Sequence, residues 1–247
     1  MIYIQPLEQF EIYNIFNFEH ILNSFFTNMF LFMLIILLTI YIFFLKISQN
    51  KLKLIPNPWQ QIYEFIYLFV LDTLKAQVDP KALRFFPYIF TIFIFILISN
   101  LIGLIPFSFT VTSNIFITFS MGFGTWVGLT ILGFMIQKLK FLKLFLPSGV
   151  PTLLIPILLV IEIVSYISRA FSLSIRLFAN LMSGHTLLHI LAFFSSKLLK
   201  YKLIIGLLAL ALVLAITVLE VGIAFLQAYV FMVLICIYLN DSYHADH

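Results

Sequence analysis

The chain has 247 residues, of which 63% are hydrophobic and only 10% are charged, and its mean hydropathy is +1.13. This balance excludes a soluble domain and predicts an all-α integral membrane protein. The single cysteine excludes a disulfide framework and a cysteine-cluster metal site, and the net charge of +4 gives no reason to expect nucleic-acid binding.

The first half of the chain alternates apolar runs with short charged stretches. The first 24 residues contain Glu8, Glu11 and Glu19 but no Lys or Arg, which is the wrong charge for a signal or transit peptide. In chain order, we expect an outer N-terminal segment (1–24), a first span (25–45), an interfacial amphipathic helix (58–77), and a hydrophobic hairpin amounting to two further spans (85–109 and 115–137).

The second half predicts two unusually long helices, 152–196 and 203–240, joined by a short polar turn. A helix of about 40 residues is roughly 60 Å long, about twice the hydrocarbon core of a bilayer. Each helix must therefore tilt, kink or protrude, and the two form an antiparallel hairpin. The whole chain, 1–247, is predicted to be a single membrane domain.

Lysine and arginine clusters predict the orientation. With the N-terminus outside, the clusters at 46–53, 81–84 and 138–143 all lie inside, whereas the lysines at 197–202 lie outside and break the rule. Three clusters outweigh one, so we expect the N-terminus outside.

Arg176 is the most informative residue, because it lies in an apolar stretch long enough to cross a bilayer. An arginine at that depth costs about 2.5–3.5 kcal/mol on insertion scales and usually marks an ion path. On a helical wheel, Arg169, Glu162 and Asn180 fall within about 40° of Arg176, in a polar stripe with Ser165, Ser172 and Ser183.

A second polar set lies apart from this stripe. His185 and His189 fall on the other side of the same helix, while Glu220 and Gln227 share a face of the next helix, which Asp241 ends. Carboxylates and imidazoles can hand on protons, and a fixed cation between two such sets would block direct passage. The cation would also attract a carboxylate from a partner, which predicts a proton path broken at Arg176.

The run SRAFSLSIRLFANLMSGH resembles subunit a (subunit 6) of the mitochondrial F-type ATP synthase, as do PLEQFEI, NLIGLIPFSF, LPSGVPTLLIP and LEVGIAFLQAYVF. The likeness covers essentially the whole chain in order. It implies a proton-translocating stator subunit with two offset half-channels separated by Arg176, which drives rotation of a c-ring. It implies no catalytic residues and no cofactor, and the chain has no P-loop for ATP.

The resemblance also implies a role for each polar residue. Arg169 would be a second, structural arginine. From the residues alone, we expect Asn100 and His189 to be structural or peripheral. The proton path would comprise Arg176, Glu162, His185, Glu220, Asn180, Gln227, Asp241 and Tyr166.

The family context implies partners and a location. The partners would be c-ring subunits, peripheral stalk subunit b, other membrane-sector subunits and the lipid bilayer, in a dimeric complex. The location would be the mitochondrial inner membrane, with the gene in the organelle.

Several alternatives stay open at this point. Arg176 could snorkel to a headgroup or pair with a carboxylate, and Glu162 could simply neutralise Arg169. His185 and His189, at spacing i, i+4, are a weak candidate for a metal site. The chain could also be a proton-coupled transporter or antiporter-type subunit of a respiratory complex, or a structural membrane anchor.

Overall fold

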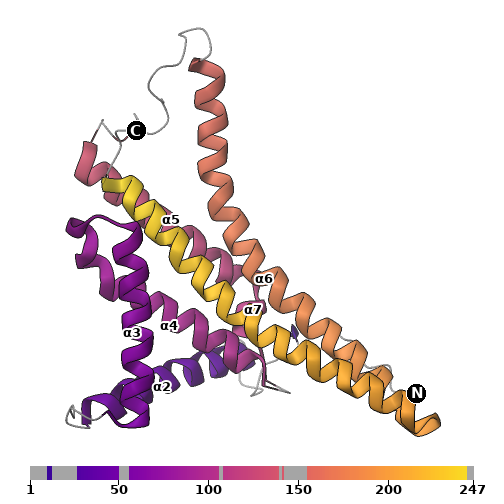
Figure 1. Cartoon of the computed structure of the whole chain (residues 1–247). Helices are drawn as coiled ribbons and strands as arrows, with labels where there is room; N and C mark the ends of the chain where they lie inside the picture. Colours follow the sequence, from indigo (N-terminus) through magenta and orange to yellow (C-terminus); the bar gives the residue numbers. More distant parts are fainter. Residues whose placement is uncertain are drawn as a thin grey trace, which may run out of the picture. The chain divides into compact units, whose positions relative to one another are not determined.

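The computed structural model describes residues 10–12, 27–49, 56–105, 108–138, 141 and 155–243. Within these ranges the elements are helices, as Figure 1 shows, and the predicted all-α fold is confirmed. They are α2 (Asn28–Gln49), α3 (Pro58–Gln77), the 3-10 helix η2 (Pro80–Phe85), α4 (Phe86–Gly103), the 3-10 helix η3 (Val111–Ser113), α5 (Ile115–Gln137), α6 (Ile155–Tyr201) and α7 (Leu203–Tyr243). Most of the predicted outer segment 1–24, residues 152–154 of the first long helix, and His244 and His247 lie outside the described residues.

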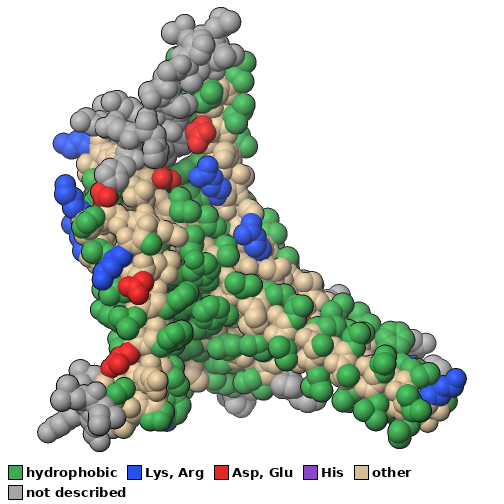
Figure 2. All heavy atoms as spheres, in the orientation of Figure 1, with side chains coloured by type: hydrophobic (Ala, Val, Ile, Leu, Met, Phe, Trp, Pro, Cys, Tyr) green, Lys and Arg blue, Asp and Glu red, His purple; other side chains and the backbone are tan. Residues whose placement is uncertain are grey.

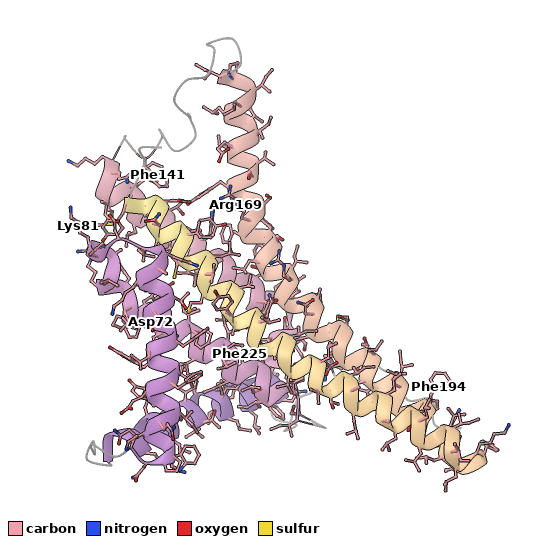
Figure 3. All side chains as sticks on the ribbon, in the orientation of Figure 1. Asp72, Lys81, Phe141, Arg169, Phe194 and Phe225 are labelled. Atoms are coloured by element: carbon pink, nitrogen blue, oxygen red, sulfur yellow. The ribbon has the colours of Figure 1, made fainter. Side chains whose placement is uncertain are left out.

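Five of the described helical stretches are long and apolar enough to cross a membrane: Asn28–Lys46, Pro80–Gly103, Ile115–Gln137, Ile155–Tyr201 and Leu203–Tyr243. Helix α3 is not among them. It carries exposed Asp72 and Lys75, and Figure 3 shows Asp72 on its side. An amphipathic helix of this kind suits the surface of a bilayer better than its core.

The two C-terminal helices are longer than the sequence predicts. Helix α6 has 47 residues and α7 has 41, which correspond to about 70 and 60 Å of helix. Only Lys202 separates them, and its N–H donates to the Leu198 carbonyl at 2.8 Å. The segment 197–202, where we expected a polar turn, is therefore helical except for Lys202. The backbone hydrogen bonds of α6 continue through Lys202 itself.

The chain forms two compact units, each built from parts of several helices. Unit 1 comprises residues 1–42, 95–117 and 177–228, and unit 2 comprises residues 43–94, 118–176 and 229–247. Each unit is described separately below.

In unit 1, the α6 and α7 segments run side by side as an antiparallel hairpin (Figure 1). Gly206 permits the close approach, since a Cβ built there would lie 2.6 Å from the backbone Cα of Leu199. A separate apolar cluster of Ile36, Phe109 and Val111 packs α2 against the segment that follows α4. Figure 2 shows hydrophobic side chains over most of the visible face of the hairpin, as expected for a surface in lipid or against another membrane protein.

In unit 2, aromatic rings join α3 to its neighbours. Tyr67 lies 4.8 Å from Phe86, and Phe69 lies 5.7 Å from Tyr229, measured between ring centroids. The end of α7 is fixed twice: Ser242 Oγ donates to the Leu129 carbonyl at 3.1 Å, and Arg84 donates to the Tyr243 hydroxyl at 2.7 Å. These contacts hold the helix end that carries Asp241.

Candidate functional site

Unit 1 contains a cavity of about 250 Å³ between α4, α6 and α7. It gathers five of the residues that the sequence singled out, although they are spread over more than 120 positions of the chain. The five are Asn100, Asn180, His185, Glu220 and Gln227. All of them are buried except Asn180, which is half-buried.

Two amide side chains tie the helices together around this cavity. Asn180 Nδ2 donates to Gln227 Oε1 at 3.2 Å, and Asn100 Nδ2 donates to the Ala224 carbonyl at 3.3 Å. Ala224 is itself buried, and a small residue there permits close packing of the helices. The Asn180–Gln227 bond fixes the register of α6 against α7.

The Glu220 carboxylate lies against Gly184, the residue before His185. A Cβ built on Gly184 would be 2.6 Å from Glu220 Oε1, so only glycine leaves room for the carboxylate in this position. The chain thereby places a carboxylate of α7 next to the turn of α6 that carries the imidazole.

Several buried polar atoms around this cavity have no hydrogen-bond partner within the described part of the chain. They are both carboxylate oxygens of Glu220, Nε2 of His185, Nε2 of Gln227 and Oδ1 of Asn100. Buried polar groups are normally satisfied by protein or water, and this volume is large enough for several water molecules. The cavity therefore presents polar groups with unused hydrogen-bonding capacity to a volume that water could fill.

His189 lies one turn after His185 and is half-buried. No group of three or more His, Cys, Asp or Glu side chains that could hold a metal ion occurs among the described residues. The i, i+4 histidine pair therefore gains no third ligand in this part of the structure.

Unit 2 contains the two arginines, which line a second cavity of about 410 Å³ between α6 and α7. Arg176 donates to Ser172 Oγ at 3.4 Å, and Arg169 donates to Ser165 Oγ at 3.5 Å. Both arginines are exposed, and Figure 3 shows Arg169 projecting from α6. Each guanidinium thus donates to a serine one turn earlier in α6, and both pairs belong to the predicted polar stripe.

The surroundings of the arginines are apolar. Ile175 is 50% exposed beside Arg176, and Val230, Val233 and Leu234 of α7 line the same cavity. A permanent cation on an apolar surface requires a counter-ion from another molecule, because an unpaired charge in an apolar environment is costly.

Tyr166 belongs to a buried aromatic group in unit 2. Its ring centroid lies 5.6 Å from that of Trp126 and 5.5 Å from that of Tyr238. Arg169 lies three residues after Tyr166 on α6, and Asp241 lies three residues after Tyr238 on α7. The contact between the two tyrosines therefore brings together the helix turns that carry Arg169 and Asp241.

Glu162 is half-buried on α6. The alternative that Glu162 neutralises Arg169 stays a prediction. Seven residues separate the two, and Arg169 donates to Ser165 Oγ.

Some residues at these sites were not predicted. Gly184 lies inside the arginine-containing motif, but nothing in its spacing showed that it makes room for Glu220. Trp126 and Phe10, which contact Tyr166 and His185, lie in unrelated segments, and no periodic pattern connects them to the site.

Comparison with known proteins shows the family of the chain. The family model "ATP synthase A chain" matches residues 29–240. The chain is similar to ATP synthase subunit a of Acanthamoeba castellanii, with 46% identity over 98% of each chain. It is also similar to ATP synthase subunit a of Pelagibacter ubique, with 45% identity over 98% of each chain, and of Marchantia polymorpha, with 46% identity over 96% of this chain and 97% of the other.

These matches cover nearly the full length of the chain and include both arginines, the histidine pair and Glu220. They favour neither the transporter nor the anchor alternative. The chain belongs to the ATP synthase subunit a family, the proton-translocating subunit of the membrane sector of that enzyme.

Proposed function

We propose that protons cross this subunit through two offset half-channels, with Arg176 as the barrier between them. The observation that supports this most directly is the division of the polar residues. The cavity of Glu220 and His185 belongs to unit 1, while Arg176, Arg169 and the Tyr166 group belong to unit 2.

The unit 1 cavity is the proposed outer half-channel. Water entering it meets the Glu220 carboxylate and the His185 imidazole, both of which can accept and release a proton. The path ends at the amides of Asn180 and Gln227. Asn180 lies one turn after Arg176 in α6. A proton leaves this cavity to a carboxylate on a neighbouring ring subunit.

Arg176 then controls that ring carboxylate. Its guanidinium keeps its proton, so it repels a migrating proton and favours the ionised form of a carboxylate that approaches it. The guanidinium donates to Ser172 Oγ and lines the unit 2 cavity. The ring carboxylate must release its proton near Arg176 and take up another on the far side, which couples transport to rotation.

The proposed inner half-channel uses Glu162, Tyr166 and Asp241. Arg169 acts as a structural residue here, because it lies one turn after Tyr166 on α6 and donates to Ser165 Oγ. The driving force is about 2.3 kcal/mol for each charge that crosses 100 mV.

The remaining assignments follow from this function. The subunit is non-catalytic and has no cofactor, since the ion is its only cargo. Its partners are the c-ring, the peripheral stalk subunit b and other membrane-sector subunits, in a dimeric complex. It resides in the mitochondrial inner membrane with its N-terminus outside, and its gene lies in the organelle.

The test is proton-gradient-driven ATP synthesis in membranes that carry Arg176→Gln, with passive proton leak recorded in parallel. Arg169→Gln is the matched control, since it removes the same charge from the same stripe. We expect Arg176→Gln to abolish synthesis and alter the leak, while Arg169→Gln in an assembled complex retains part of the synthesis. Unchanged synthesis with Arg176→Gln in an assembled complex would overturn the barrier role.

A further inference from the structure

The segment 10–12 is distant in sequence from the residues that line the unit 1 cavity, yet it makes two contacts within unit 1. The Phe10 ring lies 6.3 Å from the His185 imidazole, with the two ring planes at 74°. The next residue, Glu11, accepts a hydrogen bond through its backbone carbonyl from Asn28 Nδ2 at 3.0 Å, at the start of α2. Two neighbouring residues are thus fixed to two different helices, which gives the Phe10 ring a defined place.

The perpendicular arrangement is one of the two that aromatic rings prefer, because the positive edge of one ring meets the negative face of the other. His185 is only 8% exposed, although it lines the cavity. Its Nε2 has no hydrogen-bond partner within the described ranges. The Phe10 side chain has no hydrogen-bonding group, so its ring contacts the imidazole without competing for either nitrogen.

A relaying imidazole must receive a proton on one nitrogen and release it from the other, which requires a ring that keeps its orientation. Gly184 of α6 and Glu220 of α7 line the cavity, but neither is a flat surface that fixes the plane of the imidazole. The Phe10 ring is such a surface.

We infer that Phe10 is a positioning residue for proton transfer: its ring holds the His185 imidazole in the wall of the outer cavity. The segment 10–12 is then part of the outer half-channel and does more than precede the first span. This inference rests on the proposed role of His185.

The first experiment compares passive proton flux through the membrane sector of the assembled complex for Phe10→Ala, Phe10→Leu and Phe10→Tyr. Ile12→Ala is the matched control, because Ile12 lies two residues away and is 50% exposed. We expect Phe10→Ala and Phe10→Leu to lower flux about two- to tenfold, the range that the loss of one aromatic pair produces. Phe10→Tyr and Ile12→Ala should retain normal flux.

The second experiment is a double-mutant cycle with His185→Ala. If Phe10 acts through the imidazole, Phe10→Ala causes no further loss of flux when His185 is already absent. Equal losses in both backgrounds would overturn the inference, as would full flux with Phe10→Leu, which replaces the ring by an aliphatic side chain of similar bulk.

The outcomes separate this inference from the proposed function. Normal flux with His185→Ala would remove the proposed relay itself. Reduced flux with His185→Ala but normal flux with Phe10→Ala would leave the relay intact and overturn the role of Phe10 alone.

Discussion

The carboxylate of Glu220 fits against the backbone of Gly184, at the point where any side chain on residue 184 would collide with it. This contact joins the two long helices beside His185. A side chain added at residue 184 would therefore displace the Glu220 carboxylate without removing it.

We therefore expect Gly184→Ala to reduce proton flux while the complex still assembles. The added methyl would lie 2.6 Å from Oε1, and the carboxylate end of Glu220 is flexible enough to rotate away. Proton-gradient-driven synthesis should fall about tenfold or more, because a misplacement of about 1 Å can have that effect. Gly222→Ala is the control, since nothing lies within 4 Å of a Cβ built there. Equal rates for both variants would contradict this prediction.

The hairpin itself depends on Gly206. A Cβ on this residue would lie 2.6 Å from the backbone nitrogen and Cα of Leu199, and a backbone cannot rotate aside as a side chain can. We expect Gly206→Ala to destabilise the subunit by about 1–3 kcal/mol, the usual result of overpacking. Thermal denaturation of the detergent-solubilised complex would measure this. Gly128→Ala serves for comparison because its surroundings are open, and a melting temperature unchanged by Gly206→Ala would show that the helices separate easily there.

The hydrogen bond between Asn180 and Gln227 should support proton transfer, because it holds α6 and α7 in register around the cavity. Gln227→Leu removes the acceptor at 3.2 Å and leaves the Asn180 amide without that partner in a partly buried place. We expect a several-fold loss of synthesis, with a smaller loss for Gln227→Asn. A double-mutant cycle of Gln227→Leu with Asn180→Ala measures the coupling free energy between the two residues from the rates of synthesis. We expect about 0.5–1.5 kcal/mol. Strictly additive effects would show that the two amides act independently.

The end of α7 is fixed by Arg84, which donates to the Tyr243 hydroxyl and also lies 5.9 Å from the centre of its ring. Tyr243→Phe removes the hydrogen bond and keeps the ring. Because the pair is exposed, we expect a loss of stability of no more than about 1 kcal/mol. Limited proteolysis of the C-terminus would detect the loosened helix end. Ser242→Ala, which removes the buried bond to Leu129, should have the larger effect, and the reverse order would contradict this ranking.

The sequence by itself determined the class of protein and the nature of its chemistry. Composition and apolar length required membrane helices, because backbone groups in lipid must be paired within the chain. The position of Arg176 in an apolar run indicated an ion path, and its spacing from Arg169 predicted the shared face on which the serine pairs now hold both arginines. These properties depend on local sequence and helical periodicity alone.

Other features needed the tertiary structure. Helical periodicity places Glu220 on a face of α7, but it cannot show that this face meets Gly184 and His185. That meeting depends on the register of the hairpin, which the close approach of Gly206 to Leu199 and the bond between Asn180 and Gln227 fix. Asn100 reaches the same cavity, and Phe10 reaches His185, only because separate segments pack onto the hairpin. Contacts between residues so distant in sequence leave no periodic signal, so only the packed structure decided them.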